Sequence, residues 1–149
     1  MGRIHIEAER TVEAKPEDVY AILSDYTGGH QSILPPENFK DFVVEEGGVG
    51  TGTVLSFTMA AGGRLRPFRM RVAEPERGRV LEEKDLDSSA VTTFTVKPAG
   101  GERRSQVRIV TEWDGAKGVG GFFERTFAPG ALKRIYDREL TNLAEKVRG

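Results

Sequence analysis

The sequence predicts a single α+β domain spanning residues 1–149, in which a run of antiparallel strands is followed by one long helix. Seven segments are predicted to be strands; the first and three of the later ones alternate clearly between apolar and polar residues with a period of two, which is typical of half-buried strands. Glycine-rich gaps separate most of them. The last part of the chain instead has apolar residues at steps of three, four or five, which is typical of an amphipathic helix. A length of 149 residues fits one domain.

The N-terminal region is predicted to form one strand and two short helices. Apolar residues occupy positions 4, 6, 8 and 12 of the first segment, so a half-buried strand is expected there. Residues 15–25 are expected to be helical, because Pro16 suits a first helical position, where an N–H would be unpaired anyway. Two acidic residues follow Pro16 and favour the positive end of that helix. A second helical turn is predicted at 29–34, between a glycine pair and a proline pair.

Six further strands are predicted to follow in series. They cover residues 39–45, 51–60, 64–73, 79–85, 91–97 and 105–114. The gaps between them contain residues that tolerate turn geometry, and short connections predict an antiparallel meander. In the third of these strands Phe68 and Met70 alternate with Arg69 and Arg71. We therefore expect one apolar face and one wetter face on the sheet.

The C-terminal region is predicted to be an amphipathic helix of roughly 25–30 residues. It is expected to begin near Gly120 or Gly121, with its basic residues mostly on the side opposite the apolar stripe. Pro129 interrupts the pattern, and a proline inside a helix removes one backbone hydrogen bond and bends the axis. A kink or a break is therefore expected near residues 128–131.

Composition excludes several classes of protein. The chain has no cysteine, which excludes a disulfide scaffold, a cysteine nucleophile and a thiolate metal site. With 22 Lys+Arg and 23 Asp+Glu the net charge is −1, which argues against a nucleic-acid partner. No apolar run approaches the roughly 20 residues of a membrane span, and the N-terminus does not resemble a signal peptide. We expect a cytoplasmic protein without integral membrane association, either a monomer or a homodimer.

Two stretches resemble a known superfamily. Residues 12–26, VEAKPEDVYAILSDY, look like the opening strand-to-helix junction of polyketide cyclase/dehydratase-like proteins. Residues 121–129, GFFERTFAP, are similar to the start of their C-terminal helix. These proteins form a branch of the START-like helix-grip superfamily, also called SRPBCC, and the resemblance covers essentially the whole chain. It implies a curved seven-stranded antiparallel sheet wrapped around the long C-terminal helix, with two short helices after the first strand and a cavity between sheet and helix.

Apolar residues on the expected inner faces are candidates for lining that cavity. They are Phe57, Phe68, Met70, Phe94, Ile109, Trp113, Phe123 and Phe127. In an arbitrary fold such residues form the core, so core packing and ligand contact both remain open. Met70 fits either interpretation, because its flexible thioether fills irregular space and adapts to varied ligands.

Four polar residues are candidates for orienting a ligand. Tyr26 and His30 follow the first helix and are expected at the cavity mouth, where His30 could carry a proton near neutral pH; the alternative is that both are surface loop residues. Thr111 lies in the inward phase of its strand, and Tyr136 lies on the apolar stripe of the C-terminal helix. Motifs for nucleotides, zinc or an activated serine are absent, so neither a cofactor nor a metal is predicted.

Two charged groups are expected on the wet face of the sheet instead. The first comprises the carboxylates Glu7, Glu9, Glu112 and Asp114, which could do acid/base work only if they faced a cavity. The second comprises Arg64, Arg66, Arg69, Arg71, Arg77 and Arg79. These arginines would form an anion-binding surface or pair across strands with Glu74, Glu76, Glu82 and Glu83; we expect pairing.

Three functions remain open from the sequence. The first is binding or transport of a hydrophobic small molecule, such as a lipid, polyketide or isoprenoid-like compound, with loops 26–36 and 61–64 gating access. The second is a polyketide cyclase/dehydratase-type enzyme using the same cavity, for which only His30 or Tyr26 can be nominated as acid/base. The third is a protein-interaction module with a closed core.

Overall fold

A seven-stranded antiparallel sheet in the order β1-β7-β6-β5-β4-β3-β2 forms one layer of the computed structural model, which describes residues 3–61, 64–114 and 129–148. The strands are β1 (Arg3–Val12), β2 (Phe39–Glu46), β3 (Val54–Ala61), β4 (Arg64–Glu76), β5 (Val80–Asp85), β6 (Val91–Pro98) and β7 (Ser105–Asp114). Strands β2 to β7 pair in chain order, and β1 joins the far side of β7. The predicted meander is therefore confirmed.

Strand bounds differ from the predicted ones where turn geometry takes over. Strand β3 begins at Val54 rather than at residue 51, because the chain turns at Gly50 and Gly52, whose φ angles are +62° and +92°. At Gly50 a side chain would also collide with the carboxylate of Glu74. Strand β4 extends to Glu76, beyond the predicted residue 73, through an irregular pairing with β5.

The two short helices after β1 are α1 (Pro16–Ser24) and α2 (Gly29–Ile33), as predicted. The Asp25 carboxylate accepts hydrogen bonds from the backbone N–H groups of Thr27 and Gly29, which fixes the turn between the helices. A β-carbon at Gly29 would lie 2.8 Å from the carbonyl oxygen of Ile22. Glycine at position 29 therefore allows α2 to approach α1 closely and sets the direction of the residues that follow it.

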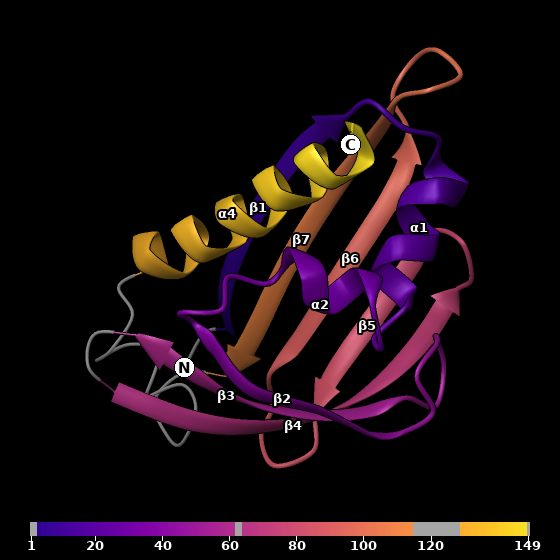
Figure 1. Ribbon diagram of the computed structural model, residues 1–149. Coiled ribbons are helices and arrows are strands. Elements are labelled where there is room, and N and C mark those ends of the chain that lie inside the picture. The colour runs from indigo at the N-terminus through magenta and orange to yellow at the C-terminus, as the bar shows by residue number, and fades with distance from the viewer. Residues whose placement is uncertain (1–2, 62–63, 115–128, 149) are drawn as a thin grey trace.

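The C-terminal helix α4 (Pro129–Arg148) covers the inner face of the sheet. Its predicted beginning near Gly120 or Gly121 lies outside the described residues. Of the segment 128–131, where a kink or a break is expected, residue 128 also lies outside them, and α4 begins at Pro129. The buried positions recur at helical spacing: Leu132, Ile135, Tyr136, Glu139, Leu140, Leu143 and Ala144. Figure 1 shows α4 lying across the sheet on the same side as α1 and α2. None of the helices in the described ranges is long and apolar enough to cross a membrane.

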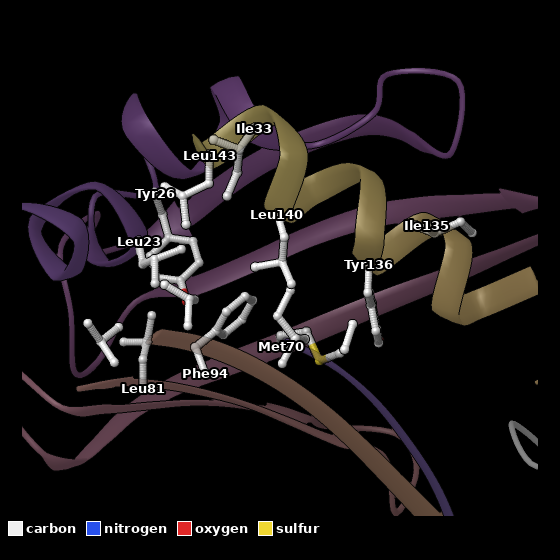
Figure 2. Close-up of a cluster of buried hydrophobic side chains, with 14 of the residues drawn as sticks. Leu23, Tyr26, Ile33, Met70, Leu81, Phe94, Ile135, Tyr136, Leu140 and Leu143 are labelled. Carbon is white, nitrogen blue, oxygen red and sulfur yellow. The ribbon is translucent and has the colours of Figure 1, made fainter. Parts of the chain in front are cut away.

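The hydrophobic core lies between the helices and the concave face of the sheet. In Figure 2, Tyr136 and Leu140 point from α4 toward the sheet, while Met70 and Phe94 lie on the strand side. Leu140 is 1% exposed, and full burial of one such side chain contributes about 1.5–3 kcal/mol. Along β7 every second residue is buried, as the alternation predicts. The sheet and α4 together therefore enclose the region in which a cavity was expected.

Candidate functional site

A cavity of about 40 Å³ lies between the sheet and helices α2 and α4. Its lining comprises His30, Leu34, Phe39, Phe42, Leu55, Phe57, Met59, Phe68, Met70, Glu83, Ala90, Thr92, Phe94, Thr111, Tyr136 and Glu139. Roughly 10–15 Å³ of such space holds one water molecule, so the cavity admits a few waters. The two layers therefore do not interlock completely, and Met59 and Met70 give the wall side chains that readily change shape.

Four phenyl rings from neighbouring strands form one wall of the cavity. Phe57 of β3 lies 5.5 Å from Phe68 of β4, 5.3 Å from Phe39 of β2 and 6.3 Å from Phe42 of β2, measured between ring centroids. Residues three apart on a regular strand face opposite sides. Between Phe39 and Phe42, however, the backbone bulges at Asp41, which has a φ of +54°. The bulge brings both rings to the cavity.

A polar row crosses the floor of the cavity. Glu83 of β5 pairs in register with Thr92 of β6, and Thr92 pairs with Thr111 of β7. The hydroxyl oxygens of Thr92 and Thr111 are 2.7 Å apart, and Thr111 also shares a short hydrogen bond with the Tyr136 hydroxyl. A continuous chain of hydroxyl groups therefore links the sheet to α4.

The acidic end of this row meets a histidine. Oε2 of Glu83 accepts a 2.7 Å hydrogen bond from the Tyr26 hydroxyl and lies 3.5 Å from Nε2 of His30. On the other side of the ring, Nδ1 of His30 lies 2.7 Å from the carbonyl oxygen of Leu23, which can only accept. Nδ1 therefore carries a proton, and in neutral His30 the lone pair of Nε2 faces Glu83. These contacts form an acid–base pair inside the protein.

Tyr26 and His30 do not lie at the cavity mouth or in a surface loop. Tyr26 is 0% exposed and His30 is 3% exposed, and their rings stack with centroids 4.4 Å apart. The reason is the tight α1–α2 turn, which directs both side chains toward the sheet. Among the described lining residues, the partly exposed ones are Leu34, Phe39 and Phe42, so the cavity comes nearest to the surface there.

A second carboxyl enters the cavity from α4. Glu139 is 2% exposed, and its Oε2 has no hydrogen-bond partner in the part of the chain that the structure describes. Burial raises the pKa of Glu139 well above its usual range, and the nearby Glu83 adds to this effect. Burial also raises the pKa of Glu83, although His30 and Tyr26 oppose the rise. The neutral forms of both acids are therefore favoured in the cavity.

The structure brings together seven of the candidate binding residues in the cavity lining: His30, Phe57, Phe68, Met70, Phe94, Thr111 and Tyr136. Tyr26 lies behind His30 and is not part of the lining. Ile109 and Trp113 are buried in the core and are not part of the lining. Phe123 and Phe127 lie outside the described residues. That the lining residues bind a ligand stays a prediction.

Sequence reasoning misplaced or missed two acids of the cavity. The expectation that Glu83 lies on the wet face is wrong, because Glu83 shares the inward phase of β5 with Leu81 and Asp85. The alternation in the sequence already indicated this, because Glu83 lies two residues after the apolar Leu81 and so faces the same side of the strand. Glu139 was missed, although it lies three residues after Tyr136, on the apolar face of the helix.

The other charged groups lie outside the cavity. Glu7 accepts two hydrogen bonds from Arg108, of 2.9 and 2.8 Å, and His5 contacts both Glu7 and Glu112 on the outer face. Arginines pair with acids as expected, but with partly different partners: Arg69 with Glu45, Arg77 with Glu74 and Arg66 with Asp85. No group of three or more His, Cys, Asp or Glu side chains within residues 3–61, 64–114 and 129–148 could hold a metal ion.

Comparison with known proteins gives one family and many structural neighbours. The family described as polyketide cyclase / dehydrase and lipid transport matches residues 3–148. The solution structure of KanY protein is 39% identical over 100% of both chains, with a TM-score of 0.85.

Two more distant neighbours have known names. The Zhui aromatase/cyclase from a Streptomyces species is 18% identical over 99% of this chain and 94% of its own, with a TM-score of 0.74. The major latex-like protein 151 of Panax ginseng is 12% identical over 97% of each chain, with a TM-score of 0.72. At these identities the two neighbours share the fold. No curated protein matches significantly.

Proposed function

The chain belongs to the polyketide cyclase / dehydrase and lipid transport family of the helix-grip superfamily, and on this premise we propose that it binds a hydrophobic small molecule between its sheet and α4. The ligand class is lipid, polyketide or isoprenoid-like. One observation carries the proposal: a mostly apolar cavity in which a few polar groups converge at one side. Ligand sites in proteins typically have this composition.

The energy of binding would come from burial. Each Å² of apolar ligand surface removed from water contributes about 25 cal/mol, and the phenyl wall offers flat surfaces for rings or chains. Thr111 and Tyr136 would orient an oxygen of the ligand. A ligand larger than the present cavity would enter past Leu34 and Phe42 and displace the two methionines of the wall.

A thermal-shift screen against fatty acids, quinones, polyketides and isoprenoids tests this function. Saturation at a hundred times the dissociation constant stabilises a protein by about 2.7 kcal/mol, so a binding compound gives a clear rise in Tm. The variant Ala90→Leu fills the cavity and should lose the response. Ala73→Leu, on β4 and outside the lining, should keep it. Absence of a shift with every class, or an equal shift in Ala90→Leu, would contradict the proposal.

A second candidate function is favoured by the His30–Glu83 pair. Ring closure of a poly-ketone requires removal of a proton from a carbon next to a carbonyl, formation of the carbon–carbon bond, and later loss of the new hydroxyl as water. The His30–Glu83 pair can take the proton from carbon and return it to the departing oxygen. The alternative function is therefore a cyclase/dehydratase-type enzyme using the same cavity.

Proton exchange on a simple diketone tests this alternative without knowledge of the natural substrate. In D₂O, the wild type should exchange the α-protons of 2,4-heptanedione faster than buffer does, as followed by NMR. Glu83→Gln should reduce the rate to background, whereas Glu82→Gln, on the opposite face of β5, should not. Background exchange with the wild type would count against this chemistry.

A further inference from the structure

The cavity has an excess of acids. Glu83 and Glu139 both line it, and among the lining residues that the structure describes only His30 can carry a positive charge. The guanidinium of Arg66 lies 3.8 Å from Asp85 and 4.4 Å over the ring of Phe68, outside the lining. Enclosing two carboxyl groups with no Lys or Arg among the described lining residues disfavours their ionised forms. A ligand with a positively charged group would therefore be a suitable partner for these carboxyl groups.

The two acids differ in how well they are satisfied. Glu83 has the Tyr26 hydroxyl and the His30 ring as neighbours, at 2.7 and 3.5 Å. Glu139 leaves Oε2 without a hydrogen-bond partner within the described residues, although it is 2% exposed. Buried polar atoms are almost always hydrogen-bonded. Glu139 is therefore the point at which a ligand group would supply the missing bond.

A positively charged N–H group would supply both the hydrogen bond that Glu139 lacks among the described residues and a cation for the cavity. It donates a hydrogen bond to the Glu139 carboxylate, and such charge-assisted bonds are stronger than neutral ones. Its positive charge also favours ionisation of Glu139, which the enclosed cavity otherwise disfavours. The phenyl wall adds to this, because the faces of aromatic rings attract cations. A carboxylate ligand cannot donate a hydrogen bond to Glu139, and the ionised forms of both acids would repel it.

We propose that the cavity accepts a hydrophobic amine whose ammonium group contacts Glu139, with its apolar part against the rings of Phe57 and Phe68. This inference rests on the ligand-binding function proposed above and specifies its ligand class. The ammonium group would favour the ionised form of Glu139, so binding releases a proton. Glu83 of β5, Tyr26 before α2 and Tyr136 of α4 are the other titratable groups that interact with Glu139, and His30 interacts with Glu83.

Calorimetric titration with two isosteric pairs tests the inference. The pairs are benzylamine with benzyl alcohol, and decylamine with decanol, at neutral pH. Each amine should bind at least about tenfold more tightly than its alcohol, as expected for one charge-assisted hydrogen bond. In Glu139→Gln this preference should disappear. Glu145→Gln, which removes an exposed carboxylate from the same helix, should retain it.

The outcomes separate this inference from the proposed function. Binding of the alcohols with equal or greater affinity than the amines would overturn the amine assignment and leave hydrophobic binding standing. A preference for amines that survives Glu139→Gln would show that surface charge causes it, and would also overturn the assignment. If neither member of either pair binds, both the ligand-binding function and the inference fail. Even if Glu139→Gln does not fold, the absence of an amine preference in the wild type overturns the assignment.

Discussion

The hydroxyl of Tyr26 donates a 2.7 Å hydrogen bond to Oε2 of Glu83, although 57 residues separate the two in the sequence. Both side chains are buried, and Glu83 is thereby fixed beside His30. The bond joins the segment between α1 and α2 to the central strand β5. The acid–base pair of the cavity therefore depends on how the short helices dock on the sheet.

Tyr26→Phe should destabilise the protein by about 1–3 kcal/mol, because a buried carboxyl loses its hydrogen-bond donor. The free energy of unfolding from urea titration measures this. Tyr20→Phe is the matched control, since Tyr20 also donates a 2.7 Å bond to a carboxylate, Glu74, but in a part-buried place. Its loss should be smaller. Equal stability of Tyr26→Phe and wild type would show that the bond contributes nothing.

Thr111→Val should destabilise the protein by about 1–2 kcal/mol, since it leaves the Tyr136 and Thr92 hydroxyls without their shared partner. Removal of both ends of the bond, in Thr111→Val with Tyr136→Phe, should cost less than the sum of the single changes. A double-mutant cycle in urea measures the coupling. Strict additivity would mean that the hydroxyl chain from the sheet to α4 is energetically unimportant.

Wild-type stability should fall relative to Glu139→Gln as pH rises above about 4.5, the ordinary pKa of the side chain. The folded pKa is raised, so the unfolded chain loses its proton first, and the folded state then binds more protons than the unfolded state. The full slope for one group is about 1.4 kcal/mol per pH unit. Urea titrations of both proteins at pH 5, 6 and 7 should diverge, and parallel curves would contradict the raised pKa of Glu139.

Asp41→Val should destabilise the protein by about 1–2 kcal/mol, because a β-branched residue fits poorly at a φ of +54°. Asp41→Gly relieves the same conformation and should change the Tm little. If the bulge holds Phe39 and Phe42 at the cavity, Asp41→Val should also lower the affinity for any ligand found in the thermal-shift screen. A tolerated valine would show that the bulge persists without a residue suited to it.

The fold was predictable from the sequence because each of its elements has a local signature. Alternation in the strand that contains Phe68 and Met70, turn residues between strands, and Pro16 at the start of α1 each predict one element independently. The resemblance of the α1 segment to a known branch then gave the order of layers. A bulge such as that at Asp41 has no such signature, so the position of Phe42 in the cavity wall was not foreseen.

The candidate site was predicted only in part, because two of its residues are buried acids and acidic side chains usually lie on the surface. Acids are almost never fully buried unless paired, and the arginines nearby in the sequence led to the expectation that Glu83 pairs on the wet face, despite its phase with Leu81. Glu139 lies on the apolar stripe of α4, and the same rule about acids gave no indication that it would be buried there. The apolar lining followed the rule, and the predicted inward positions of Phe94 and Thr111 are confirmed.

The presence of buried acids on both layers has a consequence for the order of assembly. Strand β5 can pair with its neighbours while Glu83 is still hydrated, whereas docking of α4 removes water from Glu83 and Glu139 together. The two surfaces would then meet only after a proton is captured from solvent. Closure of the two layers should consequently be a pH-dependent kinetic step, slower in alkaline than in mildly acidic solution, while the meander itself forms at a rate that pH does not alter.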